Sequence, residues 1–254
     1  MTNIGTYAFS YCGSLTSIII PDSVTSIGEY AFNGCSGLTS IRLPNGLTTI
    51  SRFAFNCCNN LQSIVVPDGV TDIGYNAFSY CRGLTSISFP DSLTNIGYNA
   101  FCYCESLTSV SIPKNVTEIN NHTFYYCRNL TNIEFPENIK SIGYSAFANC
   151  SNLLITQFPE SLESISDTAF NGCTRLANYT GTISCNIKAL CGGIAAALAE
   201  SCKITFNEIP IEQLEKIDIP TDINKLANGA FKRFTSLKEL TIGNNIKSLG
   251  GNTF

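Results

Sequence analysis

The sequence predicts a repeat solenoid, in which coils of 23 residues stack on one another along a single axis. Three residue types recur at this period through most of the chain. Proline recurs at Pro21, Pro44, Pro67, Pro90, Pro113, Pro136 and Pro159. Phenylalanine recurs at Phe9, Phe32, Phe55, Phe78, Phe101, Phe124, Phe147 and Phe170, and cysteine at Cys12, Cys35, Cys58, Cys81, Cys104, Cys127, Cys150 and Cys173. A period between about 20 and 29 residues is typical of solenoids, whose coils bury their apolar side only by stacking.

Each coil is predicted to begin with a short strand of a parallel sheet. Alternation along the first such strand turns Ile18 and Ile20 toward the core. It leaves Ser17 and Ile19 on an outer face that is polar, small and nearly uncharged in most later coils. Pro21 ends the strand, because proline cannot donate the next hydrogen bond of the ladder.

The rest of each coil is predicted to form the opposite face from short strands, turns and 3-10 segments. Val24 and Ile27 supply a second buried row. The residue after Ile27 is glycine here and in three other coils but serine or asparagine elsewhere, so glycine is preferred and not required. Ala31 and Phe32 then add one small and one large core residue, and the phenyl rings are expected to stack from coil to coil.

The repeat divides the chain into three predicted segments. Residues 1–175 form the solenoid, with a partial first repeat and seven full copies from Leu15 to Arg175. Residues 176–213 break the period and are interpreted as an insertion or as degenerate repeats. Within them, Ile187 to Cys202 is rich in alanine and leucine and predicts a short helix, weakened by Gly192 and Gly193. Residues 214–254 resume the repeat.

Both ends of the sequence fall inside a coil. The chain begins in the second half of a repeat and stops at Phe254, in the same phase as Phe231. Because solenoids need polar capping repeats, we expect this sequence to be a fragment of a longer protein. The exposed strand edges are expected to favour end-to-end self-association.

Composition argues against two classes of partner. Charged residues make up 13% of the 254 residues, and the net charge is −4. No basic face is therefore expected that could neutralise phosphates, so we predict no binding of nucleic acid. The longest mostly apolar stretch, Ala189 to Ala199, is too short to span a bilayer. We expect no membrane insertion within this sequence.

The periodic cysteines are interpreted as a buried row of free thiols that act as small apolar plugs. Parallel stacking aims their side chains alike, which disfavours disulfides between coils. They form no C-x-x-C cluster, so no metal site is predicted. Cys57 and Cys102 lie beside the row, where exposure is expected. A disulfide among Cys185, Cys191 and Cys202 stays open, because the sequence cannot choose the pair.

No enzyme chemistry is predicted. His122 is the single histidine, and its counterparts in the other coils have the varied character of a tolerant surface. A catalytic histidine would need a nucleophile and an orienting partner beside it. The phosphate-binding glycine loops and the G-x-S-x-G nucleophile motif are absent. We therefore predict no catalytic residue and no cofactor.

Tyrosines are the most suggestive surface feature. They precede the periodic cysteine in three consecutive coils, at Tyr80, Tyr103 and Tyr126, and lie near them at Tyr75, Tyr98 and Tyr125. Tyrosine gives a large contact area at low entropic cost and is enriched in binding hot spots. These six residues are the candidate protein-binding residues, and Tyr144 shares the phase of Tyr75 and Tyr98. The alternative is that their rings only cover the phenylalanine stack.

The repeat unit closely resembles the BspA-like, treponemal-type leucine-rich repeat. The resemblance rests on the run of Pro21, Ile27-Gly28, Ala31-Phe32 and Cys35 and its copies over Ile4 to Arg175 and Leu214 to Phe254. It implies a leucine-rich-repeat right-handed superhelix, shaped as a horseshoe or rod. It also implies a place on the cell surface or in secretion, and adhesion to extracellular-matrix proteins such as fibronectin. The family has no catalytic residues to transfer.

Three functions are compatible with this sequence. The first is a cell-surface adhesion or recognition module that binds host or matrix protein. The second is an intracellular protein-interaction scaffold, which would be cytoplasmic, as free cysteines would allow. The third is a structural spacer that binds nothing specifically.

Overall fold

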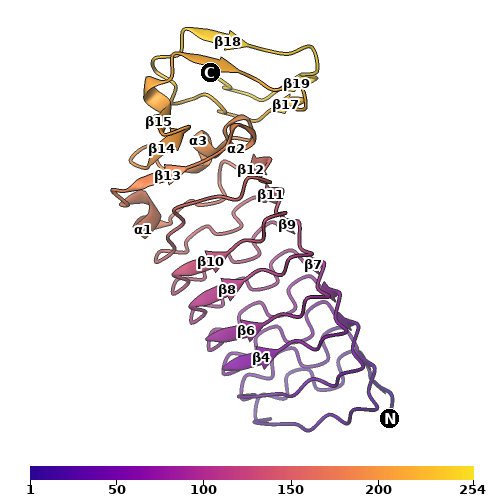
Figure 1. Cartoon of the computed structure of the whole chain (residues 1–254). Coiled ribbons are helices and arrows are strands. Elements are labelled where there is room, and N and C mark those ends of the chain that lie inside the picture. The colour runs from indigo at the N-terminus through magenta and orange to yellow at the C-terminus, as the bar shows by residue number, and fades with distance from the viewer.

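The computed structural model describes all 254 residues, from Met1 to Phe254. The coils stack into one elongated rod with the two termini at opposite ends (Figure 1). One continuous cluster of buried side chains runs from Ile4 to Phe234. The predicted leucine-rich-repeat solenoid is therefore confirmed.

The first sheet is formed by the strands that precede each proline. Its members are β4 (Ser63–Val65), β6 (Ser86–Ser88), β8 (Ser109–Ser111), β10 (Asn132–Glu134), β16 (Lys216–Asp218) and β18 (Glu239–Thr241). Paired strands are parallel, and each residue lies opposite the residue 23 positions away, as Ile64 does opposite Ile87. The middle residue of each strand is buried or partly buried, and the residues on either side of it are exposed. The predicted alternation explains this arrangement.

Threonine hydroxyl groups form hydrogen bonds between neighbouring coils at the edge of this sheet. The Oγ1 atom of Thr85 donates to the carbonyl oxygen of Gln62 at 2.9 Å, and Thr131 donates to Thr108 at 3.0 Å. Thr39 and Thr108 make the same bond to the preceding coil. These threonine hydroxyl groups thus donate their hydrogen bonds within the rod.

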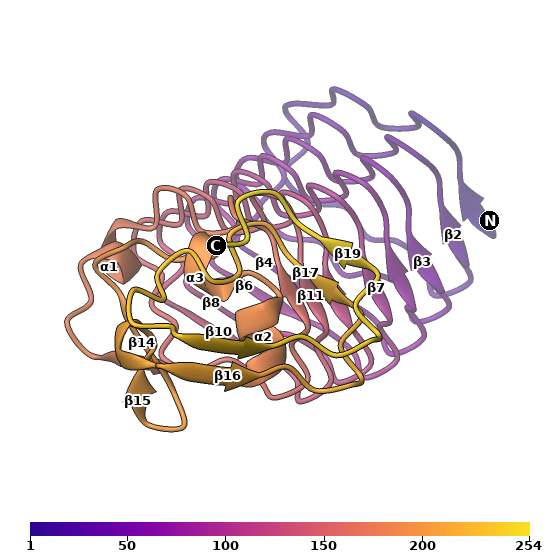
Figure 2. The ribbon, with the colours of Figure 1, turned by 90° about the horizontal axis from the view of Figure 1, so that it is seen from above.

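The second sheet lies on another side of the rod and has shorter strands (Figure 2). Its first part contains β1 (Asn3–Ile4), β2 (Ser26–Ile27), β3 (Thr49–Ile50), β5 (Asp72–Ile73), β7 (Asn95–Ile96), β9 (Glu118–Ile119), β11 (Ser141–Ile142) and β12 (Ser164–Ile165). Its second part contains β17 (Lys225–Leu226) and β19 (Ser248–Leu249). In the first part each isoleucine is buried and the residue before it is wholly or partly exposed. The glycines that follow lie against the neighbouring backbone: a Cβ on Gly74 would stand 2.7 Å from the amide nitrogen of Arg52.

A third side of the rod consists of consecutive turns, which we call the turn face. Here the bonds run to the following coil, as from the N–H of Phe32 to the carbonyl oxygen of Ala54 at 2.8 Å. Two residues of most regular coils have a positive φ, as at Tyr30 (+57°) and Gly34 (+73°). Each is the third residue of a turn closed by an N–H to C=O bond, the geometry of a type II turn.

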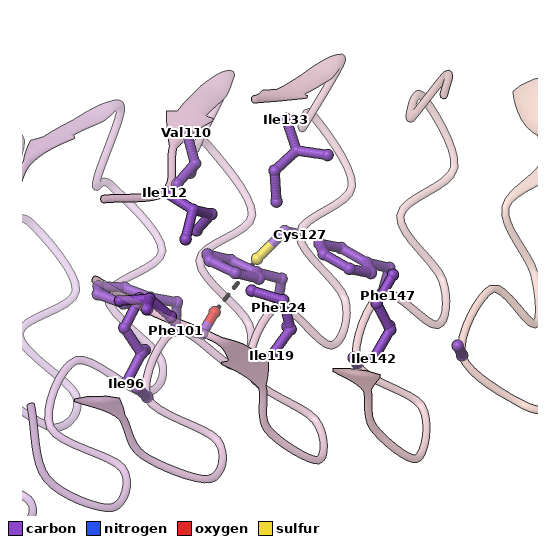
Figure 3. Packing of buried hydrophobic residues seen from close by; sticks show 14 of the residues in the cluster. Ile96, Phe101, Val110, Ile112, Ile119, Phe124, Cys127, Ile133, Ile142 and Phe147 are labelled. Atoms are coloured by element: carbon purple, nitrogen blue, oxygen red, sulfur yellow. Dashed lines mark hydrogen bonds between the residues drawn. The ribbon is translucent and has the colours of Figure 1, made fainter. Parts of the chain in front are cut away.

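The core is organised around the phenylalanine stack (Figure 3). The ring centroids of Phe101 and Phe124 lie 5.6 Å apart, and those of Phe124 and Phe147 lie 5.4 Å apart, with nearly parallel planes. Beside them, the Sγ atom of Cys127 donates to the carbonyl oxygen of Phe101 at 3.2 Å. The equivalent cysteines from Cys35 to Cys173 make the same bond and are buried. The thiols are therefore both packing groups and hydrogen-bond donors.

Residues 176–213 extend the rod without the regular period. After α1 (Thr174–Ala177), the strand β13 (Thr182–Ser184) continues the first sheet and pairs in parallel with β14 (Lys203–Phe206). The strand β15 (Ile209–Pro210) folds back on β14, and the 3-10 turn η1 (Ile211–Gln213) leads to β16. The thiol of Cys202 donates to the carbonyl oxygen of Leu176, at the 26-residue separation of the regular coils. The irregular segment thus repeats the thiol-to-carbonyl hydrogen bond of the regular coils.

Two helices stand in the second sheet's position here, where one helix was predicted. They are α2 (Ile187–Cys191) and α3 (Ile194–Ala197). Gly193 separates them with a φ of +98°, which glycine adopts without steric cost. Gly192 lies so close to the backbone of Glu163 that any Cβ would collide with its carbonyl oxygen. Gly192 is the C-cap residue of α2, and Gly193 is the N-cap residue of α3.

The expectation that Cys102 is exposed is wrong. Its side chain is buried, whereas that of Cys57 is partly exposed. Cys102 directly follows Phe101 and occupies the position held by Ser79 in the preceding coil, whose Oγ donates to the carbonyl oxygen of Cys102 at 3.3 Å. This position faces inward. The sequence does not indicate this, because the residue type varies from coil to coil.

Candidate functional site

The turn face positions the candidate tyrosines. Tyr80, Tyr103 and Tyr126 have φ values between +59° and +60°. Their N–H groups bond to the following coil, as from Tyr103 to the carbonyl oxygen of Tyr125 at 2.7 Å. Because backbone geometry repeats from coil to coil, the three rings leave the rod in the same direction and stack, with centroids 4.6 and 4.8 Å apart.

Three further rings join this stack. Tyr125 meets Tyr103 and Tyr126 edge to face, at centroid distances of 5.6 and 4.7 Å. His122 lies edge to face with Tyr125 at 5.4 Å and with Tyr144 at 5.2 Å. We call this surface the aromatic patch, and its residues are Tyr80, Tyr103, His122, Tyr125, Tyr126 and Tyr144.

Two arginines flank the aromatic patch. The guanidinium carbon of Arg82 lies 5.9 Å from the ring centroid of Tyr80, and that of Arg128 lies 5.0 Å from that of Tyr126. Both distances are in the range of cation–π attraction. Arg82 also faces Glu105, with Nε 3.5 Å from Oε1. The patch thus combines ring faces, hydroxyl groups and a positively charged rim.

Burial shifts the ionisation of the patch toward neutral forms. It raises the pKa values of Tyr103 and Tyr125, with neighbouring tyrosines adding to the effect. It lowers the pKa of His122, whose imidazole is therefore neutral at pH 7. Tyr80 and Tyr144 remain exposed, while Tyr103, Tyr125 and Tyr126 are partly buried. The surface offers a mostly uncharged contact area with fixed side chains.

Two of the six candidate tyrosines lie outside the patch. Tyr75 meets Phe53 edge to face at 5.2 Å, at the end of a separate aromatic row that also contains Tyr7 and Tyr30. Tyr98 is half-exposed and contacts no other ring. The structure therefore brings together Tyr80, Tyr103, Tyr125 and Tyr126, and not Tyr75 or Tyr98.

His122 and Tyr144 are patch residues outside the six candidates, and their contact with each other was not predicted. They lie 22 residues apart, one short of the period. Backbone hydrogen bonds of the turn face join residues at this separation. The N–H of His122 donates to the carbonyl oxygen of Tyr144 at 2.9 Å. A search for aromatic pairs at this second spacing would have found them. His122 is partly buried, and its φ of +56° lies in the left-handed region.

All thirteen cysteines are free, including Cys185, Cys191 and Cys202. The histidine, cysteine, aspartate and glutamate side chains form no group of three that could hold a metal ion. No helix reaches the length and hydrophobicity needed to cross a bilayer.

Comparison with known proteins identifies the repeat. The family model of the BspA type leucine-rich repeat region matches in six copies over residues 2–127, 94–210 and 184–254. Comparison with curated proteins gives no match.

Two solved structures are similar to this chain. A leucine-rich-repeat protein of Treponema pallidum is 38% identical over 60% of this chain and 72% of its own, with a TM-score of 0.58. A leucine-rich-repeat protein of Bacteroides ovatus is 26% identical over 100% of this chain and 79% of its own, with a TM-score of 0.53. With the matching family model and the coil geometry, these similarities show that the chain belongs to the BspA-type leucine-rich-repeat family.

Proposed function

We propose that this chain is a non-enzymatic protein-binding module of a cell-surface or secreted recognition protein, which adheres to host or extracellular-matrix proteins. Leucine-rich repeats are typically protein-interaction modules, and the family resemblance suggests the matrix partner. The single observation that carries the proposal is the aromatic patch. Six ring systems gather on one surface and are held there by stacking and by the backbone ladder.

The physical argument concerns the entropy of binding. A side chain that is ordered before binding loses little freedom on contact, so more of its contact energy appears as affinity. Tyr103 and Tyr126 pack against neighbouring rings and remain partly exposed. Such amphipathic rings are enriched in binding hot spots.

The first sheet is a weaker candidate for the binding surface than the turn face. Its threonine hydroxyls bond to preceding coils, and its outer side chains in β6 and β8 are serines. Serine is under-represented among hot-spot residues. Val65 is an exception, since its side chain is largely exposed. We therefore place the binding surface on the turn face.

The test is binding of the purified chain to immobilised fibronectin and other matrix proteins by surface plasmon resonance. The chain is compared with the triple variant Tyr80→Ala, Tyr103→Ala and Tyr126→Ala. Removing one hot-spot ring costs about 2 kcal/mol, which corresponds to roughly thirtyfold in affinity. We expect the triple variant to lose detectable binding to any protein that the unaltered chain binds.

The matched control is Tyr98→Ala, which removes an exposed tyrosine of the same rod outside the patch. It should bind as the unaltered chain does. Circular dichroism checks that each variant folds. Binding retained by a folded triple variant would place the site elsewhere, and no binding to any matrix protein would argue against adhesion.

A second function, an intracellular interaction scaffold, is favoured by one observation. All thirteen cysteines are free, and Cys12 is exposed. Oxidising compartments usually pair such residues, whereas the cytosol keeps them reduced. Alkylation of native material followed by mass spectrometry separates the two functions: thirteen free thiols would favour the scaffold, and disulfides would favour the surface protein.

A further inference from the structure

A cleft of about 590 Å³ opens where the second sheet is interrupted. In the regular coils, most strands of this sheet pair in parallel with the strand of the next coil, as β5 does with β7 and β9 with β11. Between β12 and β17 that strand is missing, and the C-terminal end of α2 takes its place. Figure 1 shows α2 and α3 between these two parts of the sheet.

The end of α2 fills only the floor of this position. The N–H of Ile165 donates to the carbonyl oxygen of Gly192 at 3.0 Å, and the N–H of Ala227 donates to that of Cys191 at 2.8 Å. Cys191 and Gly192 are both buried. Side chains of β12 and of residues 222–228 form the walls above them. The cleft is therefore a trough bounded by two strand edges.

One backbone donor at this trough has lost its partner. In other coils the equivalent N–H donates to the preceding coil, as Glu163 does to Lys140 at 2.9 Å and Lys247 to Asn224 at 2.8 Å. The N–H of Asn224 makes no such bond, because the preceding coil turns into α2. Asn224 lines the cleft and is exposed. A carbonyl oxygen in the trough would restore the missing bond.

The charges of the walls are unequal. Lys188 and Asp222 form an ion pair, with Nζ 3.0 Å from Oδ2, and their charges offset each other. Glu163 and Asp167 on the β12 wall and Lys225 on the β17 wall form no ion pair. The lining thus carries three carboxylates and two ammonium groups. The excess negative charge is complementary to a cationic group.

We propose that this trough is a second binding site, which takes an extended peptide segment of a partner protein carrying a lysine or arginine. The peptide lies in the place of the missing strand, and one of its carbonyl oxygens accepts from the N–H of Asn224. Its basic side chain lies against the β12 wall, near Glu163 and Asp167. Addition of a strand to an open sheet edge is a common mode of peptide recognition. The trough contains no aromatic side chain on which a sugar ring could stack.

The test uses a phage-displayed library of random decapeptides, selected on the full chain. Enriched peptides are synthesised with a fluorescent label, and their affinities are measured by fluorescence anisotropy. We expect lysine or arginine to be enriched at one position. Asp167→Asn should weaken binding by about tenfold, since a hydrogen bond to a charged group contributes on this scale. Ser164→Tyr should abolish binding by filling the trough.

Two variants of regular coils serve as matched controls. Glu118→Gln removes an exposed carboxylate from β9, and Ser26→Tyr adds a ring to β2 at the position equivalent to Ser164. Both should leave the affinity unchanged. Hydrogen exchange gives an independent readout, because the amide of Asn224 should be protected only when peptide is bound.

Several results would overturn the proposal: no enriched peptide, enrichment of acidic peptides, or equal affinity for Ser164→Tyr and the unaltered chain. Binding of neutral oligosaccharides that Ser164→Tyr abolishes, without any peptide binding, would also overturn it. The triple tyrosine variant should bind the selected peptides normally. Failure of this site and failure of the aromatic patch are therefore distinguishable.

Discussion

The residues with a positive φ carry a steric cost and also build the aromatic patch. An L-residue in this conformation costs about 1 to 2 kcal/mol because its Cβ approaches a carbonyl oxygen. Glycine avoids this cost at Gly34 and Gly172, but Tyr80, Tyr103 and Tyr126 stand at the same turn position. Ring stacking offsets part of the cost. A strained backbone conformation that persists at non-glycine residues in consecutive coils is consistent with a functional surface.

Cys57 tests this steric cost, because it occupies the same turn position without an aromatic ring. Its φ is +59°. Cys57→Gly should raise the free energy of unfolding by about 1 kcal/mol, since glycine adopts this conformation without strain. Urea denaturation measures the change. Cys58→Gly, in the buried row beside it, should lower the stability, and a lower stability of Cys57→Gly as well would refute the strain argument.

The buried thiols predict a loss of stability at alkaline pH. Burial raises the pKa of Cys35, Cys102 and Cys191 to about 12, from 9.0. Above pH 9 the unfolded chain therefore releases these protons while the folded chain keeps them, so unfolding becomes more favourable. The loss develops between about pH 9 and pH 12.

Urea midpoints at pH 7.5, pH 9 and pH 10.5 measure this effect. The midpoint should fall steadily above pH 8.5. Cys35→Ser should show a shallower fall than the unaltered chain, because a hydroxyl does not ionise in this range. A midpoint independent of pH up to pH 10.5 would contradict the burial of the thiols.

Periodicity predicted the inward residues well and the turn residues poorly. The phenylalanine and cysteine rows were identified because one residue type fits each buried position. The left-handed turns were missed because tyrosine, histidine and cysteine stand where glycine or asparagine would signal them. The pair of His122 and Tyr144 was missed because the turn face joins residues 22 apart, whereas the sheets join residues 23 apart.

At the scale of elements, Arg233 adds side-chain contacts between the irregular segment and the resumed coils. The side chain of Arg233 is buried and lies 2.7 Å from Glu212, from Nη2 to Oε1. It also donates to the carbonyl oxygens of Ala199 and Cys202. Arg233 thus joins a resumed coil to η1 and to the end of the α3 loop. The sequence showed where the period stops, but β13 pairs with Gln157 at a separation of 27 residues and with β14 at a separation of 21, which no repeat predicts.

Arg233→Ala should destabilise the C-terminal part of the rod. Breaking this pair leaves Glu212 and two carbonyl oxygens without their partner, at a cost of about 2 to 4 kcal/mol. Hydrogen exchange should become faster in residues 199–214, while residues 60–130 keep their protection. Lys238→Ala breaks an exposed ion pair with Glu215 and should change stability by less than about 0.5 kcal/mol. Equal effects of the two variants would contradict this role of Arg233.

At the scale of the whole molecule, the phenylalanine stack joins the regular coils into one core. Phe101 stacks on Phe78 at 5.4 Å and on Phe124 at 5.6 Å, and its side chain is fully buried. Each coil buries its apolar side only against its neighbours, so a defect in the middle of the rod affects coils on both sides.

Phe101→Ala should lower the free energy of unfolding by about 3 to 5 kcal/mol, because it removes a ring and leaves a cavity. Urea denaturation followed by circular dichroism measures the loss. Tyr98→Ala, an exposed position of the same coil, should stay within about 0.5 kcal/mol of the unaltered chain. An unchanged midpoint for Phe101→Ala would refute the inward assignment of the phenylalanine row.

The proposed function is tested most directly by hydrogen exchange of the chain, free and saturated with the matrix protein that binds it, with fibronectin as the first probe. If the aromatic patch is the binding surface, amides of residues 79–82, 102–105 and 122–128 should become protected in the complex. The strands of the first sheet between residues 63 and 134 should show no change. Protection confined to those strands, or identical exchange with and without the matrix proteins, would contradict the account.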